Sequence, residues 1–235
     1  MTNPYFQFKD FRVWHDRCAM KVGTDGVLLG AWAQGEGART ALDVGTGSGL
    51  IALMLASRYP ELQVTAVDID SQAVAQAADN FAQSSFASRL SVLEGDFTRS
   101  LTLPDKHYDL IVSNPPFFRE QVLSPSSSRN LARSASNLPF DALLRESQRL
   151  LSPGGRLCVI IPYDACTSFI GDAAAEGLKL SRRCDIRSTG RKSPVRSLLC
   201  LTHEADDTRL SELTIHATGG GYTPEMKELT NRFYL

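Results

Sequence analysis

The sequence predicts an α/β protein built on a seven-stranded mixed sheet, with helices on both faces and an antiparallel last strand. Strand-like and helix-like patterns alternate from Ala41 onward, and the helix-like segments run for about ten to fifteen residues. This alternation is typical of a parallel sheet wound on both faces. The last two strand-like runs are joined by a Gly/Pro-containing turn with no helix between them, so the closing strand is expected to run antiparallel.

The individual elements follow from hydrophobic periodicity and from turn residues. The expected strands are 41–45, 64–68, 90–93, 108–112, 156–161, 178–187 and 195–202. The expected helices are 49–58, 72–83 with Ser71 as a plausible N-cap, 141–151 stopping at Ser-Pro-Gly-Gly, and 163–176 ending at Gly177.

Composition places the chain among ordinary globular proteins. Its 235 residues, 43% hydrophobic and 22% charged, fit one domain with a large core. The net charge of -1 does not indicate a polyanionic partner, so a nucleic-acid site would depend on local clustering of charge.

The sequence carries no sign of a membrane, a secretory signal or a metal site. No apolar run approaches the roughly 18–20 residues that span a bilayer. The five cysteines show no C-x-x-C pairing, so buried free thiols in a reducing cytosol are expected. We therefore predict a cytoplasmic protein without a metal ion.

A polar segment between Phe118 and Pro139 interrupts the alternation of strands and helices. It contains six serines together with Arg129 and Arg133. About twenty residues of polar loop are uncommon in a compact domain, and two readings stay open: a loop that contacts substrate, or plain disorder.

A glycine-rich turn follows the first strand of the alternating region. Asp43-Val44-Gly45-Thr46-Gly47-Ser48-Gly49 ends a strand and opens a helix. Alone it could be a dinucleotide loop or a tight structural turn. The spacing is G-x-G-x-G, however, and Asp43 would repel a pyrophosphate but attract the cationic ammonium or sulfonium of S-adenosylmethionine.

Two further acids end the next two strands. Asp68 stands about twenty residues after the glycines, where a carboxylate can accept hydrogen bonds from both ribose hydroxyls. Asp96, followed by Phe97, could accept one from the adenine amine. Each alone would be a cap or turn residue, but the series indicates a ligand crevice. The expected contacts of the cofactor are Asp43, Gly45, Gly47, Gly49, Asp68, Asp96, Phe97 and Asn114.

Asn114-Pro115-Pro116-Phe117 follows the fourth strand and is the candidate catalytic motif. The plainer reading is a strand-terminating turn. After the acid series we favour a site for an exocyclic aromatic amine: the Asn114 amide oxygen and the Pro115 carbonyl would accept its two N–H groups where positive charge develops. Phe117 would stack on the base, and transfer would need positioning, with no metal and no tuned general base.

Six basic residues cluster near the last two strands with only one acid, Asp185, among them. They are Arg182, Arg183, Arg187, Arg191, Lys192 and Arg196. Two readings stay open: a solvated basic face, or a phosphate-binding patch that Arg129 and Arg133 extend.

The N-terminal segment interleaves four aromatic residues with basic ones between Tyr5 and Lys21. A flap packed over the core and a set of base-stacking platforms are both possible, and the flap is favoured. His15 alone is not a catalytic candidate.

Together these motifs resemble the class I amino-methyltransferases that bear an N-P-P-[FY] motif, a group of adenine, guanine and glutamine modifiers. Residues 15–32 (HDRCAMKVGTDGVLLGAW), Tyr222 and the Phe-Tyr-Leu end further resemble the bacterial tRNA adenine-N6 methyltransferases that act on valine tRNA. The resemblance implies a single domain, 1–235, in which 1–35 closes over the cofactor site and 36–235 is the catalytic core. It also places Lys21 and Thr24 in the cofactor-closing segment.

The function implied by this resemblance is methyl transfer from S-adenosylmethionine, leaving S-adenosylhomocysteine, to N6 of the adenosine 3′ to the anticodon of valine tRNA. The alternatives are an rRNA guanine-N2 or protein-glutamine methyltransferase, and a non-catalytic RNA-binding module. A nicotinamide oxidoreductase is disfavoured by the glycine spacing. No obligatory protein partner is evident, so we expect a monomer or a weak dimer.

Overall fold

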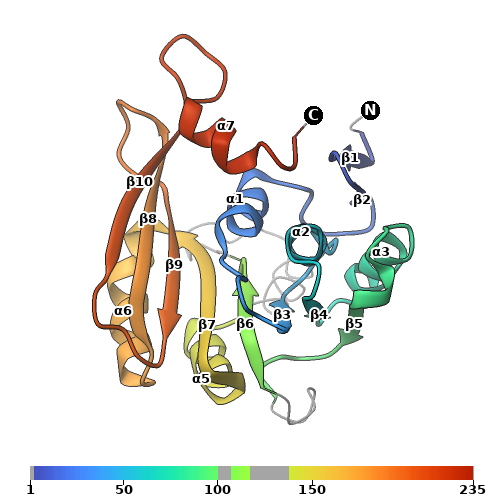
Figure 1. The fold of residues 1–235 in the computed structure, drawn as a ribbon, viewed down its shortest axis with the longest axis horizontal. Helices are drawn as coiled ribbons and strands as arrows, with labels where there is room; N and C mark the ends of the chain where they lie inside the picture. Colours follow the sequence, from blue (N-terminus) through green and yellow to red (C-terminus); the bar gives the residue numbers. More distant parts are fainter. Residues whose placement is uncertain (1–2, 100–106, 117–137, 235) are drawn as a thin grey trace, which may run out of the picture.

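The computed structural model describes residues 3–99, 107–116 and 138–234. Its centre is an eight-stranded sheet in the order β10-β8-β9-β7-β6-β3-β4-β5 (Figure 1). The strands are β3 Thr40–Val44, β4 Gln63–Asp68, β5 Leu90–Glu94, β6 Tyr108–Ser113, β7 Leu151–Pro162, β8 Lys179–Thr189, β9 Arg196–Thr202 and β10 Arg209–His216. β1 Tyr5–Gln7 and β2 Arg12–Trp14 form a separate antiparallel hairpin.

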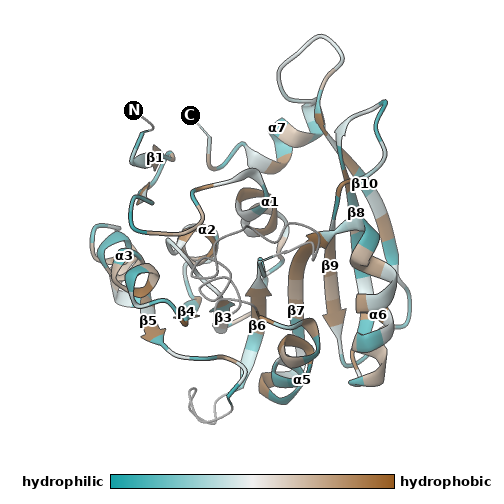
Figure 2. Cartoon of the chain, turned by 180° about the vertical axis from the view of Figure 1, so that it is seen from behind, coloured by the Kyte–Doolittle hydropathy of each residue, from teal (hydrophilic) through white to brown (hydrophobic). Residues whose placement is uncertain are grey.

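Helices cover both faces of the sheet, as the alternation predicts. They are α1 Thr24–Trp32, α2 Leu50–Arg58, α3 Ser71–Ala82, α5 Phe140–Leu150, α6 Cys166–Ala175 and α7 Pro224–Thr230, with 3₁₀ turns at Ala87–Arg89 and Tyr163–Ala165. α1, α2 and α3 lie on one face, and α5 and α6 come forward when the molecule is seen from behind (Figure 2).

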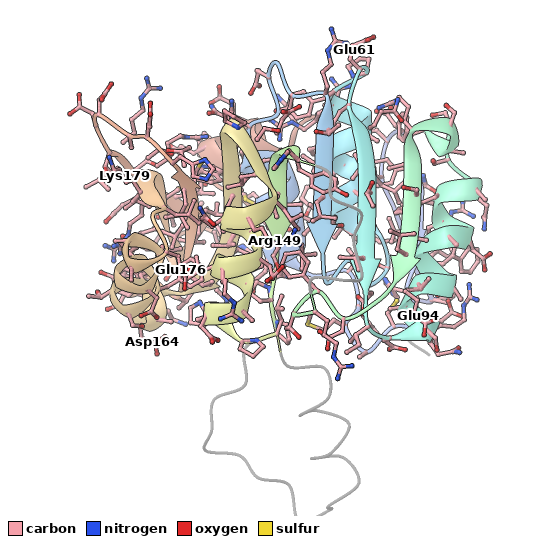
Figure 3. The ribbon with its side chains drawn as sticks, turned by 90° about the horizontal axis from the view of Figure 1, so that it is seen from below. Glu61, Glu94, Arg149, Asp164, Glu176 and Lys179 are labelled. Carbon is pink, nitrogen blue, oxygen red and sulfur yellow. The ribbon has the colours of Figure 1, made fainter. Side chains whose placement is uncertain are left out.

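The two faces of the sheet bury two separate hydrophobic cores because neighbouring side chains of a strand point to opposite sides. In β7, Cys158 and Ile160 belong to the core with α1 and α2, whereas Val159 belongs to the core with α5 and α6. Charged side chains such as Glu61 and Asp164 project from the periphery of this layered core (Figure 3).

The antiparallel orientation of the seventh predicted strand is confirmed. β9 inserts between β7 and β8 and pairs antiparallel with both, so the two predicted strands form the expected hairpin. Because all other pairs in this sheet are parallel, the carboxyl ends of β3 to β8 meet at one edge, and β9 begins there.

The prediction of seven strands is wrong by one. β10 adds an eighth strand, parallel to β8 at the edge of the sheet. Most of its residues are exposed, and Leu210 is 73% exposed, so the segment lacks the apolar run or clean alternation that marks a buried strand. The short α1 and α7 helices and the β1–β2 hairpin were not predicted either.

Two local expectations also need correction. The N-cap of α3 is Asp70, whose carboxylate accepts a 2.9 Å hydrogen bond from the backbone N–H of Gln72, whereas Ser71 is already helical. The Ser-Pro-Gly-Gly segment belongs to β7: the pairing with β6 shifts from Tyr108–Leu151 to Leu110–Arg156, so these four residues lie in an irregularity of the strand.

Candidate active site

The carboxyl ends of the central strands are tied together by hydrogen bonds. The backbone N–H of Gly45 donates to Val67 O at 2.9 Å, and that of Gly95 donates to Asp68 O at 2.9 Å. On the other side, the Ser113 hydroxyl donates to Val44 O at 2.9 Å. The turns after β3, β4, β5 and β6 therefore form one continuous edge, which carries most of the residues predicted to bind a cofactor and a substrate.

The glycine-rich turn has the left-handed backbone that glycine permits. Gly45, Gly47 and Gly49 have φ of 70°, 54° and 79°. A Cβ at Gly45 or Gly47 would meet no atom within 4 Å, so this part of the turn faces open space. At Gly49 a Cβ would lie 2.5 Å from the Phe81 ring. The first two glycines therefore leave room for a ligand, while the third allows α2 and α3 to pack closely.

Asp43 is fully buried at the end of β3. Its Oδ2 accepts hydrogen bonds from the Thr46 hydroxyl at 2.6 Å and from the backbone N–H of Ala52 at 3.2 Å. Its Oδ1 is buried with no hydrogen-bond partner among the described residues. Burial raises the pKa of Asp43 to about 7, against the opposing effect of these two hydrogen bonds. An unpaired buried carboxylate oxygen suits a cationic ligand, because a nearby positive charge would stabilise the ionised form.

Asp68 holds the glycine-rich turn from the neighbouring strand. Its Oδ2 accepts a 2.8 Å hydrogen bond from the backbone N–H of Gly47, and its Oδ1 accepts a 3.0 Å hydrogen bond from the backbone N–H of Asp70. Burial raises the pKa of Asp68. Each carboxylate oxygen has a second lone pair, so these bonds leave acceptor capacity for ligand hydroxyls. Ile69, which follows it, is 46% exposed and adds an apolar surface that the sequence analysis overlooked.

Asp96 and Phe97 follow β5 but use their side chains differently. Oδ1 of Asp96 accepts hydrogen bonds from the Thr98 N–H and hydroxyl at 2.9 and 2.6 Å, and its other oxygen lies 3.3 Å from Arg99 Nε. The Phe97 ring is buried in the core on the α5 side, beside Leu42 and Val67. At Phe97, therefore, the backbone is the part left for a ligand to contact.

The candidate catalytic motif begins where β6 ends. Asn114 and Pro116 are half-buried and Pro115 is buried, directly after Ser113, whose hydroxyl bonds to Val44 in the neighbouring strand. This contact places Asn114 next to the strand that carries Asp43. Phe117 lies outside the described residues, as do Arg129, Arg133 and all of the polar segment up to residue 137.

The N-terminal segment runs along the same edge as a flap, in which Phe8 and Phe11 are buried and Phe6 stays exposed. Asn80 of α3 holds it: the Asn80 amide donates to Trp14 O and to Ser48 O, both at 2.8 Å, and accepts from the Trp14 N–H at 3.0 Å. Further along, burial and the charges of Asp68 and Asp70 raise the pKa of Cys18 to about 12. The segment therefore passes close to Asp68.

Lys21 and Thr24 lie where this segment leads into α1. Lys21 is exposed, and Thr24 is the first residue of the helix. The next residue, Asp25, forms an ion pair with Arg196 at 2.9 Å, which joins α1 to the start of β9 at the carboxyl edge of the sheet. Asp25 and Arg196 are thus placed at the edge of the sheet that also carries Asp43 and Asp68.

The predicted basic cluster is not one continuous patch. Arg183 pairs with Asp185 at 2.7 Å, and Arg187 pairs with Glu212 at 3.0 Å. Arg182 stacks on Trp32, its guanidinium carbon 4.3 Å from the ring centroid. Two of the acids that pair with this cluster, Glu212 and Asp25, lie far away in the sequence, which is why counting acids within the segment missed them. Of the six basic residues, Arg191 and Lys192 are exposed, in the turn between β8 and β9, and the other four are half-buried.

The part of the chain that the structure describes also bears on metal binding and on membrane-spanning helices. No group of three or more His, Cys, Asp or Glu residues is arranged to hold a metal ion there. Within the same residues, no helix is both long and apolar enough to cross a membrane.

Comparison with known proteins relates this geometry to methyltransferases. The family model described as the methyltransferase small domain matches residues 22–166. A protein of Parabacteroides distasonis named tRNA1(Val) (adenine(37)-N6)-methyltransferase is 44% identical over all of this chain and 99% of its own length. The protein of the same name from Phocaeicola vulgatus is 46% identical with the same coverage.

Solved structures agree on the fold. A predicted O-methyltransferase from Agrobacterium tumefaciens superposes with a TM-score of 0.68 at 24% identity, covering 90% of this chain and 98% of its own. At this identity the similarity concerns the fold alone, which is a methyltransferase fold of the Rossmann type.

Proposed function

This chain belongs to the family of methyltransferases with the methyltransferase small domain, and from that membership we propose that it methylates N6 of an adenosine in tRNA with S-adenosylmethionine as donor. The relatives that match it from end to end carry the name tRNA1(Val) (adenine(37)-N6)-methyltransferase, so adenosine 37 of tRNA1(Val) is the proposed target.

The observation that carries the proposal is the junction between β3 and β6. Asp43, with its unpaired Oδ1, ends one strand, and Asn114 follows the next, held there by the Ser113–Val44 hydrogen bond. A site for a cation and a site for an amine thus lie side by side, as a methyl transfer from a sulfonium to nitrogen requires.

The residues fit the donor. When bound, S-adenosylmethionine supplies a methyl group on a positively charged sulfonium. Asp43 offers a negative charge for its cationic part, and Gly45 and Gly47 leave open space for close approach of the ligand. Asp68 keeps acceptor capacity for ribose hydroxyls, and exposed Ile69 offers an apolar face beside it.

Asn114 and Pro115 act on the substrate. The lone pair of an adenine N6 amine is delocalised into the ring, which makes the amine a weak nucleophile. If the Asn114 amide oxygen and the Pro115 carbonyl accept its two N–H groups, partial negative charge faces the nitrogen as it becomes positive. Pro116 cannot donate a ladder hydrogen bond, which keeps the segment out of the sheet, and Phe117 is proposed to stack on the base.

The state of the cysteines bears on the compartment in which the protein works. All five cysteines are free, and four are buried, which suits a reducing compartment. We propose that the protein acts in the cytoplasm as a monomer or weak dimer with tRNA as its partner.

The decisive experiment follows the methyl group. The protein is incubated with labelled S-adenosylmethionine and, separately, with tRNA, ribosomal RNA and a protein extract from cells lacking the gene, and the tRNA nucleosides are analysed by mass spectrometry. Label in tRNA as N6-methyladenosine is expected. Label in ribosomal RNA as N2-methylguanosine, or in protein as methylglutamine, would replace the proposal with one of those activities.

A further inference from the structure

A cleft lies between the N-terminal hairpin, the start of α1 and the C-terminal helix α7, and it is not lined by Asp43, Asp68 or Asn114. Its volume is about 770 Å³, within the range of about 300–1,000 Å³ that is typical of sites for small ligands. We call it the terminal cleft, because both ends of the chain contribute to it; its functional lining is Phe6, Lys9, Tyr222, Lys227, Asn231 and Tyr234.

Three aromatic rings line the terminal cleft: Phe6 is exposed, and Tyr222 and Tyr234 are half-buried. Phe6 on β1 is 37% exposed, although the rings beside it are packed. Its centroid lies 5.9 Å from that of Tyr234, which in turn stacks on Tyr222 at 5.9 Å and 12°. Tyr222 and Tyr234 therefore form an aromatic wall beside Phe6. A flat base stacking on such a wall gains free energy whatever its identity.

Lysines supply the charge of the terminal cleft. Lys9 and Lys227 are its only charged residues, and no acidic residue is among the described residues that line it. Lys9 Nζ donates to Asn231 O at 2.5 Å, which fixes one positive charge at the rim. The Asn231 side chain can both donate and accept, as the edge of a base requires. Aromatic faces flanked by cations form the combination that binds single-stranded nucleic acid.

The terminal cleft is connected to the proposed cofactor site by one short piece of chain. Val22 and Thr24 line the cleft, and Cys18 lies near Asp68. Three residues separate Cys18 from Val22, so the four Cα steps between them span at most about 14 Å. In addition, Asp25 ties the start of α1 to Arg196 at the carboxyl edge of the sheet. A strand of RNA that reaches the crevice can therefore also reach the cleft.

We propose that the terminal cleft binds an unpaired nucleotide of the RNA substrate that flanks the methylated adenosine, with its base on Phe6 and its phosphate at Lys227 and Lys9. This inference rests on the proposed function. It assigns the cleft to recognition of the RNA and gives it no part in the methyl transfer itself.

The test compares Phe6→Leu and Lys227→Gln with the unmodified full-length protein. RNA binding is measured by fluorescence anisotropy of a labelled anticodon stem-loop at several salt concentrations, and kcat and KM are measured with tRNA. Each variant is expected to weaken RNA binding and raise KM about five- to hundredfold while kcat at saturating RNA stays unchanged. Lys227→Gln is also expected to lower the slope of log K against log salt by about 0.7.

Two controls separate recognition from folding. Phe6→Tyr keeps the ring and is expected to bind RNA like the unmodified protein. Lys179→Gln is the charge control, because it removes a lysine at the amino end of β8, outside the terminal cleft. Unchanged KM and binding in both cleft variants, while the unmodified protein methylates tRNA, would overturn this inference alone. Failure of the unmodified protein to methylate tRNA would overturn the proposed function and this inference with it. Micromolar binding of adenosine monophosphate that Phe6→Leu abolishes would assign the cleft to a free nucleotide and also overturn the inference.

Discussion

The Thr46 hydroxyl donates a 2.6 Å hydrogen bond to Oδ2 of Asp43, while Oδ1 of the same carboxylate is buried without a partner among the described residues. One oxygen of the carboxylate therefore stabilises the glycine-rich turn, and we propose that the other serves the cofactor. This arrangement predicts separable contributions of Asp43 to folding and to binding.

Asp43→Asn is expected to bind S-adenosylmethionine about ten- to hundredfold more weakly without unfolding the protein. The amide oxygen of asparagine can still accept from Thr46 and Ala52, but the negative charge is lost. Isothermal titration calorimetry measures the affinity, and thermal unfolding checks the fold. Undiminished affinity in a folded Asp43→Asn protein would contradict the role of Asp43 in cofactor binding.

The same carboxylate makes stability and binding depend on pH in opposite directions. The pKa of Asp43 is raised from 3.8 to about 7, so the folded state keeps a proton that the unfolded state has lost. The contribution of this group to the free energy of unfolding is therefore complete below about pH 4 and falls as pH rises toward 7, by on the order of 4 kcal/mol at most. Cofactor affinity should instead rise between pH 6 and 8. Denaturant unfolding and calorimetry across this range measure both, and Asp43→Asn should flatten both profiles.

Gly47→Ala and Gly49→Ala are expected to lower cofactor affinity and stability to different extents, for different physical reasons. At Gly47 the new Cβ enters open space, so the cost to folding is about 1–2 kcal/mol of left-handed strain, and the main loss is cofactor affinity. At Gly49 the Cβ would lie 2.5 Å from Phe81, so overpacking adds about 1–3 kcal/mol and lowers the Tm more.

Thermal unfolding and cofactor titration of both glycine variants distinguish these effects. Phe81→Leu, which removes the obstructing ring, provides the control: it should restore part of the Tm of Gly49→Ala and none of the affinity of Gly47→Ala. Equal losses of Tm in the two glycine variants would contradict the division of roles within the turn.

Arg191 and Lys192 are the members of the basic cluster that we expect to contact RNA. Both are exposed in the turn between β8 and β9, whereas Arg187 pairs with Glu212. Arg191→Gln with Lys192→Gln should weaken tRNA binding, lower its salt dependence by a slope of about 1.5 and leave Tm unchanged. Filter binding at several salt concentrations measures this effect. Arg187→Gln is the matched comparison, and a larger loss of slope in that variant would contradict the assignment.

The sequence predicts the central fold well because the signal is local. A strand that ends in glycines or an acid and runs into an apolar helix is recognisable within about twenty residues, as at Asp43 and Asp68. β10 is different: its side chains are mostly exposed and its position depends on pairing with β8, nearly thirty residues away. No hydrophobic period in the segment itself records that pairing.

The site residues divide in the same way. The acids at strand ends could be found from spacing, since parallel strands bring their carboxyl ends together. The hydrogen bonds that Asn80 makes to Trp14 and Ser48 could not, because they join three segments that are distant in the sequence. For the basic cluster, the sequence analysis overestimated the free positive charge. Glu212 pairs with Arg187 from β10, a strand that the sequence analysis did not predict.

Asn114→Ala is expected to separate catalysis from cofactor binding. Removing the amide oxygen takes away one acceptor for the amine in the transition state, which should lower kcat about 10²- to 10³-fold. Cofactor affinity should change little, because Asn114 is one of eight expected cofactor contacts and the others, including Asp43 and Asp68, lie on other strands and turns. Single-turnover methylation with labelled donor measures the first quantity and calorimetry the second. Ser113→Ala is the neighbouring control: it removes only the hydrogen bond to Val44, so it should lower stability more than the rate. Undiminished turnover in Asn114→Ala would refute the amine site, whereas a parallel loss of cofactor binding would show that Asn114 shapes the crevice rather than the reaction.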